Sequence, residues 1–112
     1  MPGTIVHLDC AKILDWSSFH YEFSTVFGFP DFYGENMNAW IDCMTSLDKP
    51  EDGMSAVHTA NDGVLTLQLE NVKAFREQHP DFYAAIIECS AFVNWRRLEV
   101  GESSVLALSF RD

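Results

Sequence analysis

Hydrophobic and polar residues follow a strand-like pattern in three short segments of the chain. The first, from Thr4 to Asp9, is rich in β-branched and apolar residues. The second, from Val64 to Glu70, alternates between apolar and polar residues, and a third apolar segment runs from Ser104 to Phe110. These patterns predict three β-strands.

The segment after the first predicted strand has the spacing of a helix. One apolar stripe recurs at helical intervals and consists of Phe19, Phe23, Val26 and Phe27. Ser17 or Ser18 can cap the start of this helix, and Gly28 can end it in a left-handed turn.

Three further helices are predicted. One runs from about Asn36 to about Leu47, after a break at residues 30–34. Another begins at Asn71 as a cap and stops before Pro80, which suits the first turn of the next helix. That last helix is long and apolar and ends before Gly101, whereas residues 48–63 are polar and predict a loop.

Strands that alternate with helices favour parallel strands joined by right-handed crossovers. We therefore expect an α/β fold in which a three-stranded parallel sheet packs with about four helices. The length of 112 residues predicts a single domain over residues 1–112.

Charge narrows the classes of partner. Seventeen acidic residues against seven basic ones give a net charge of −10. Such a surface repels nucleic acid and anionic lipid and attracts basic proteins. No apolar run approaches the ~18 residues that a membrane-spanning helix needs, and the first ten residues do not have the pattern of a secretory signal. We expect a cytoplasmic protein that binds neither nucleic acid nor membranes.

The cysteines and histidines do not predict a metal or cofactor site. Cys10, Cys43 and Cys89 are far apart, and their spacing matches no metal-binding motif. Three thiols cannot all pair within one chain, so free and mostly buried thiols are expected.

One segment, PDFYGENMNAWIDC at residues 30–43, combines carboxylates with aromatic residues at the start of a helix. At 100° per residue, Trp40 points to the core, and Met44 lies at the edge of the core side. The other residues predicted on the core side are Asn36, Ala39, Cys43 and Leu47. Glu35, Asn38 and Asp42 point outward at spacings of three and four.

The segment FPDFYGENMNAWIDCMTSL, residues 29–47, resembles the signature of the barstar family, whose founding member inhibits the bacterial ribonuclease barnase inside the cell. The matching residues are Pro30, Asp31, Tyr33, Gly34, Glu35, Asn36, Ala39, Asp42 and Cys43. The resemblance implies a barstar-like fold. It also implies that the loop and helix block a ribonuclease active site, with Asp42 in place of a substrate phosphate. The implied partner-binding residues are Phe32, Tyr33, Gly34, Glu35, Met37, Asn38, Ile41 and Asp42.

Several residues depart from the family pattern. Phe32 replaces a tyrosine, Asn38 an aspartate and Ile41 a tryptophan. A further carboxylate that the family supplies from the last long helix falls at Arg96 or Arg97. These differences imply that the partner differs, while the fold is kept.

Three functions are compatible with the sequence. The leading hypothesis is an inhibitor of a basic ribonuclease and not an enzyme. The alternative is an acidic interaction module for a basic partner that is not a ribonuclease. A third reading makes Glu35 and Asp42 a catalytic pair of carboxylates, as in glycoside cleavage, although both lie on a convex helix face.

The last long helix also leaves two possibilities open. Ile86, Ile87, Ser90, Asn94 and Leu98 can form one buried face. The remaining apolar residues, Phe82, Cys89, Phe92 and Trp95, are either covered by neighbouring helices or form a second contact surface.

Overall fold

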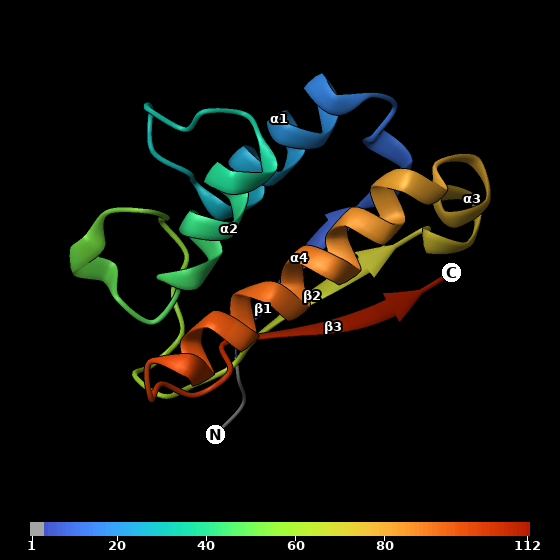
Figure 1. Ribbon diagram of the computed structural model, residues 1–112. Helices are drawn as coiled ribbons and strands as arrows, with labels where there is room; N and C mark the ends of the chain where they lie inside the picture. The colour runs from blue at the N-terminus through green and yellow to red at the C-terminus, as the bar shows by residue number, and fades with distance from the viewer. Residues whose placement is uncertain (1–3) are drawn as a thin grey trace.

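The computed structural model describes residues 4–112 and contains a three-stranded parallel sheet (Figure 1). Its strands are β1 (Thr4–Asp9), β2 (Leu65–Glu70) and β3 (Leu106–Arg111), and β2 lies in the centre. Leu65 pairs with Thr4 on one side and with Leu106 on the other. The predicted α/β architecture is confirmed, with slightly later starts for the second and third strands.

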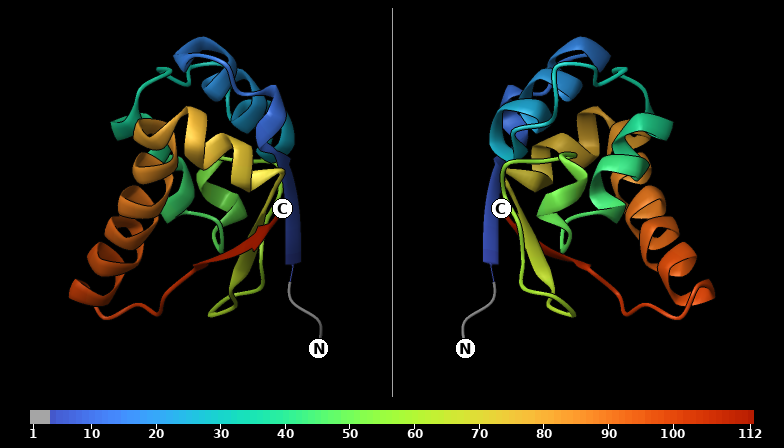
Figure 2. Two further views of the ribbon diagram at one scale, coloured as in Figure 1. Left: turned by 90° about the vertical axis from the view of Figure 1, so that its right-hand side faces the viewer. Right: turned by 90° about the vertical axis from the view of Figure 1, so that its left-hand side faces the viewer.

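Four α-helices gather on one side of this sheet (Figure 2). They are α1 (Trp16–Phe27), α2 (Met37–Thr45), α3 (Val72–Gln78) and α4 (Pro80–Glu99). Two short 3-10 helices, η1 (Cys10–Lys12) and η2 (Pro50–Asp52), lie in the connections. The predicted number of helices is confirmed, and η2 adds local structure to a segment predicted as loop.

Helix α1 begins with a different cap from the one predicted. Asp15, not Ser17 or Ser18, is the N-cap, and its carboxylate accepts a hydrogen bond from the Ser18 backbone N–H at 2.7 Å. The Ser18 hydroxyl in turn accepts from the Asp15 N–H, which completes a capping box. The predicted end is confirmed, since Gly28 adopts a left-handed conformation with φ +66°.

Asn71 stands at the start of α3, but its side chain does not cap the helix. Its Nδ2 group donates instead to Oδ1 of Asp9 at 2.7 Å. This bond joins the end of β2 to the end of β1. The predicted cap is therefore wrong, because a partner on the neighbouring strand engages the amide.

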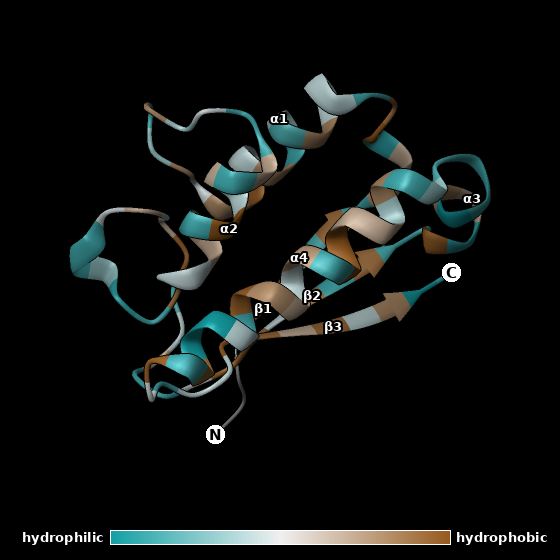
Figure 3. Cartoon of the chain, viewed as in Figure 1, coloured by the Kyte–Doolittle hydropathy of each residue, from teal (hydrophilic) through white to brown (hydrophobic). Residues whose placement is uncertain are grey.

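The core lies between the sheet and the helices. Leu65, Leu67 and Leu69 of β2 are fully buried and alternate with half-buried polar residues. Figure 3 shows hydrophobic positions along β1 and β2, whereas η2 and α3 are largely hydrophilic. The period-two pattern thus directs one face of the sheet toward the helices.

Helix α4 leaves part of its apolar surface exposed. The residues it buries are Phe82, Ile86, Ser90, Val93 and Arg97. Leu98 was predicted on the buried face but is 59% exposed, and Phe92 and Trp95 are 46% and 54% exposed. Neighbouring helices therefore cover Phe82 but not these three side chains.

Within residues 4–112, no helix has the length and apolar character to cross a membrane.

All three cysteines are free thiols, and two of them are buried. Burial, aided by the nearby Asp9 and Glu70 carboxylates, raises the pKa of Cys10 to about 12. Burial and the Asp42 carboxylate raise the pKa of Cys43 to about 11. These thiols stay protonated and unreactive at neutral pH.

We therefore expect dithiothreitol to leave the melting temperature unchanged, since disulfides do not contribute to the fold. Thermal denaturation followed by circular dichroism with and without the reductant tests this expectation. A clear drop in melting temperature on reduction would contradict it.

Candidate functional site

The loop before α2 is held in place by the start of the helix itself. Asn36 is the N-cap, and its Oδ1 accepts from the Ala39 N–H at 2.8 Å. The Nδ2 group of the same side chain donates to the Gly34 carbonyl at 3.1 Å. Glu35, between these residues, has φ +51°, which is strained for a residue with a side chain. One asparagine thus fixes both the loop and the first turn of α2.

The two adjacent aromatic residues of this loop have different environments. Phe32 is 74% exposed, whereas Tyr33 is half-buried and packs against Phe29 with ring centroids 4.7 Å apart. The Tyr33 hydroxyl lies 2.6 Å from Nδ1 of His20 on α1. Burial lowers the pKa of His20, which favours the neutral imidazole as acceptor for this hydroxyl. Tyr33 therefore supports the loop from within, and Phe32 presents its ring to solvent.

Helix α2 presents the predicted polar stripe. Asn38 and Asp42 are exposed on α2, and Glu35 is exposed just before it. Trp40 is fully buried, as predicted, and so is Met44, which was predicted at the edge of the core. We call the set of predicted contact residues the loop–α2 surface: Phe32, Tyr33, Gly34, Glu35, Met37, Asn38, Ile41 and Asp42.

Besides Tyr33, two further members of the loop–α2 surface are less accessible than the stripe. Met37 and Ile41 are half-buried and pack against the core. In the sequence they directly precede the exposed Asn38 and Asp42. The structure therefore brings all eight predicted residues to one region, but only part of them is free to contact a partner.

Arg96, one of the two positions that the resemblance aligns with a carboxylate of the family, meets this surface through a bond to Asp42 that the sequence did not predict. Nη1 of Arg96, on α4, donates to Oδ1 of Asp42 at 2.9 Å. The two side chains are 40% and 58% exposed. They line a hollow of about 400 Å³ together with residues of α2 and of the connection after it: Thr45, Ser46, Asp52 and Met54. An arginine 54 positions away in the sequence thus bonds to the carboxylate of Asp42.

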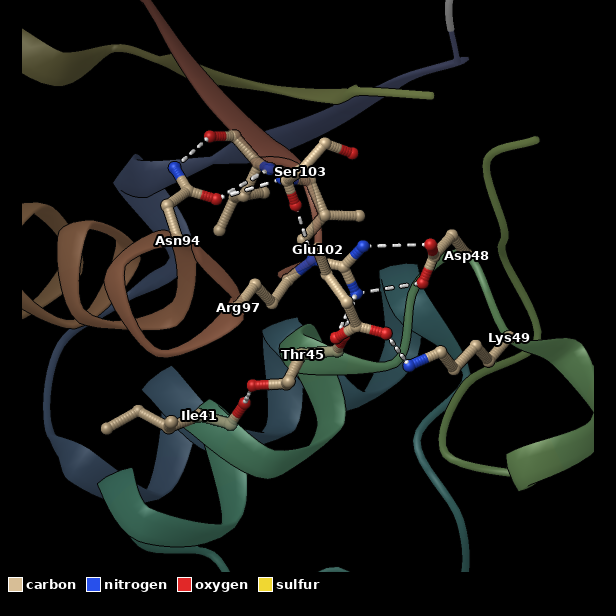
Figure 4. A network of polar contacts seen from close by, with 10 residues as sticks. Ile41, Thr45, Asp48, Lys49, Asn94, Arg97, Glu102 and Ser103 are labelled. Carbon is tan, nitrogen blue, oxygen red and sulfur yellow. Dashed lines mark hydrogen bonds and ion pairs between the residues drawn. The ribbon is translucent and has the colours of Figure 1, made fainter. Parts of the chain in front are cut away.

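A buried ion pair attaches the end of α2 to α4 (Figure 4). Arg97 bonds both carboxylate oxygens of Asp48, with Nη1–Oδ1 at 2.9 Å and Nη2–Oδ2 at 2.8 Å. Its Nη1 also donates to the Thr45 carbonyl, and its Nε donates to the Ser103 carbonyl, each at 2.7 Å. The side chains of Arg97 and Asp48 are 1% and 2% exposed. The position and orientation of α2 therefore depend on Arg97.

Electrostatics stabilises the ionised form of this pair. The hydrogen bonds from the Arg97 guanidinium lower the pKa of Asp48 below its usual value, against the opposing effect of burial. Lys49 and Glu102 form a further ion pair next to it. Asp48 lies at the start of the segment 48–63, which its polar character predicted as a loop, and that pattern gives no sign of this role. A bidentate arginine contact between distant segments has no local signal.

The structure does not assemble the catalytic pair of the third reading. Glu35 lines a separate hollow of about 260 Å³ with Trp16, His20, Asn36 and Met37. Asp42 lines the other hollow and is bonded to Arg96. The two carboxylates therefore do not converge on either of these hollows, as a catalytic pair needs to do. Among residues 4–112, no group of three or more potential ligands is arranged to hold a metal ion.

The fold and this site define a small α/β protein that displays an acidic loop and helix at its surface. The chain belongs to the barstar family, since the family model described as "Barstar (barnase inhibitor)" matches residues 3–106. A comparison with curated protein sequences gave no match. This description identifies the family by the inhibition of another protein, barnase.

Proposed function

We propose that this protein is a cytoplasmic inhibitor of a basic ribonuclease and not an enzyme. The observation that carries the proposal is the exposed carboxylate of Asp42 on α2 in a chain that matches the barstar family. In this proposal the loop–α2 surface enters the active site of the ribonuclease. Asp42 takes the place of a substrate phosphate and accepts charge-assisted hydrogen bonds from the basic side chains there.

The cognate target is found by using the protein as bait in a cell lysate. The recovered partner is then assayed for ribonuclease activity with and without added protein. A basic partner whose ribonuclease activity falls in proportion to bound protein supports the proposal. A partner without ribonuclease activity supports the alternative described next.

A second candidate function is an acidic interaction module for a basic partner that is not a ribonuclease. The observation that favours it is the reduced negative charge of the surface. Asn38 is neutral, and Asp42 is already bonded to Arg96. The active site of a ribonuclease binds a phosphodiester and is therefore strongly cationic. Such a site favours a partner surface that is more acidic than the loop–α2 surface.

Association with the basic partner should slow steeply as salt rises. The net charge of −10 attracts a basic protein over long range, and salt screens exposed charges over about 10 Å at 0.1 M. Stopped-flow measurements with the recovered partner at increasing sodium chloride test this. An association rate that stays flat across the series would count against electrostatic attraction.

The residues that depart from the family should control inhibition of barnase itself. We expect weak or no inhibition by the natural sequence. The triple variant Phe32→Tyr, Asn38→Asp and Ile41→Trp should inhibit more strongly, because it restores a hydroxyl donor, a carboxylate and a large aromatic side chain. A ribonuclease assay with barnase measures both inhibition constants.

The chain offers a matched control for that triple variant. Phe110→Tyr, Asn61→Asp and Ile5→Trp make the same chemical changes at exposed positions outside the loop–α2 surface. This control should not gain inhibition. Natural protein that already inhibits barnase as tightly as the triple variant would show that these three positions do not set specificity.

A further inference from the structure

The exposed carboxylate of α2 has a positively charged side chain bonded to it. Asp42 is the acidic residue of α2, and the guanidinium of Arg96 is bonded to it at 2.9 Å. Both side chains keep a large exposed fraction, so a docked protein can reach both charges. The face presented to a partner is therefore a pair of opposite charges and not an isolated negative charge.

Arg96 and its neighbour Arg97 have separate roles. Arg97 is buried and holds α2 against α4 through Asp48 and Thr45. Exposed ion pairs such as the one between Arg96 and Asp42 contribute little to folding stability. Arg96 therefore affects mainly the charge that the loop–α2 surface presents to a partner. The contact between α2 and α4 does not depend on Arg96.

We propose, on the basis of the function proposed above, that Arg96 is a specificity-determining residue. It makes the loop–α2 surface select a partner that places a carboxylate beside the cation that meets Asp42. Arginine does not lose its charge in proteins, so a partner cannot neutralise it by deprotonation. A uniformly cationic groove is attracted by Asp42 and repelled by Arg96.

The hollow beside this pair has the charges that such a partner needs. Asp52, from η2, lines the same hollow as Asp42 and Arg96. A partner arginine or lysine placed there meets two carboxylates, while a partner aspartate or glutamate meets the guanidinium donors that Asp42 leaves free. A partner that supplies both signs satisfies every charge of the hollow. A partner that supplies only cations leaves Arg96 without a counter-charge.

Peptide titrations followed by NMR test this without any ribonuclease. The side-chain carboxyl carbon of Asp42 is monitored while hexa-arginine is added to the natural protein and to Arg96→Gln. The variant should reach half-saturation at about two- to fivefold lower peptide concentration, the range set by one exposed ion pair. With a hexapeptide of alternating arginine and glutamate, the same substitution should give no gain, because Arg96 then contacts a glutamate.

Arg76→Gln is the matched control. Arg76 is exposed on α3, and its replacement removes the same single charge from the whole chain. An equal gain from Arg76→Gln would show that only net charge matters and would overturn the proposal. Equal half-saturation of the natural protein and Arg96→Gln with hexa-arginine would overturn it as well.

A second measurement connects this residue to target choice. Arg96→Gln is added to the triple variant that restores the family residues, and barnase inhibition is measured. We expect the inhibition constant to fall by about tenfold or more, since a charge at a desolvated interface has a larger effect than an exposed one. An unchanged constant would contradict a role for Arg96 in specificity. Failure of the triple variant to inhibit at all would count against the proposed function, while the peptide titration still decides the role of Arg96.

Discussion

Replacing Asp42 by alanine is expected to weaken binding to the cognate partner by roughly 2–5 kcal/mol or more. The carboxylate would be desolvated against several cations in the complex, and its removal leaves those cations buried without a counter-charge. Stability should change little, because the ion pair of Asp42 with Arg96 is exposed and worth about 0–1 kcal/mol. Isothermal titration calorimetry with the partner recovered from the lysate measures the loss.

The control for this substitution is Asp112→Ala. Asp112 is exposed at the C-terminus and carries the same charge, but it lies outside the loop–α2 surface. It should affect the rate of association slightly and the affinity very little. Unchanged affinity of Asp42→Ala would remove Asp42 from the centre of the proposed interface.

The second large effect is on folding. Arg97→Met should lower the free energy of unfolding by about 3–5 kcal/mol, because it leaves the carboxylate of Asp48 buried without its partner. It also removes the donors to the Thr45 and Ser103 carbonyls. Urea denaturation followed by tryptophan fluorescence measures the change.

Arg96→Met is the natural comparison, since it removes the neighbouring guanidinium from an exposed position. It should cost less than about 1 kcal/mol. Adding Asp48→Asn to Arg97→Met should recover part of the loss, because the variant then no longer buries an unpaired charge. A loss of under 1 kcal/mol for Arg97→Met alone would show that the junction does not depend on this pair.

The same pair contributes a pH dependence of known sign. The guanidinium of Arg97 holds the pKa of Asp48 below its usual value. The stabilisation is therefore fully present above the unfolded pKa of about 3.9 and is lost as pH falls through the lower folded pKa. Between neutral pH and about pH 5, Asp48 should not contribute to any change in stability.

Much of the fold was predictable because its signals are local. The strands follow from alternation, and the ends of the helices follow from short motifs. Gly28 ends α1 as predicted, and α2 starts close to Asn36 as predicted, since both effects depend on residues within one turn. Asn36 itself was predicted on the core side of the helix but is its exposed N-cap. The direction of α2 was also predictable, because Trp40 and Asp42 lie on opposite sides of any helix with this sequence.

Other features, such as one helix cap and the exposure of Leu98, depended on which distant segments pack against one another. The predicted capping role of Ser17 or Ser18 was wrong, because Asp15 is the N-cap of α1. The predicted cap at Asn71 was wrong because its side chain bonds to Asp9 instead. The predicted burial of Leu98 was wrong as well, because the buried face of a long helix depends on where its neighbours stop covering it. Local periodicity does not contain that information.

The sequence by itself determined the order of strands and helices, the family and the outward direction of Glu35, Asn38 and Asp42, since each depends on short-range spacing. The tertiary structure alone decided the charge environment of that surface. It placed Arg96 on Asp42 and buried Arg97 with Asp48, across 54 and 49 positions of sequence. The physical reason is that a charge acts through space, and only the packing of α2 against α4 brings these residues within hydrogen-bonding distance.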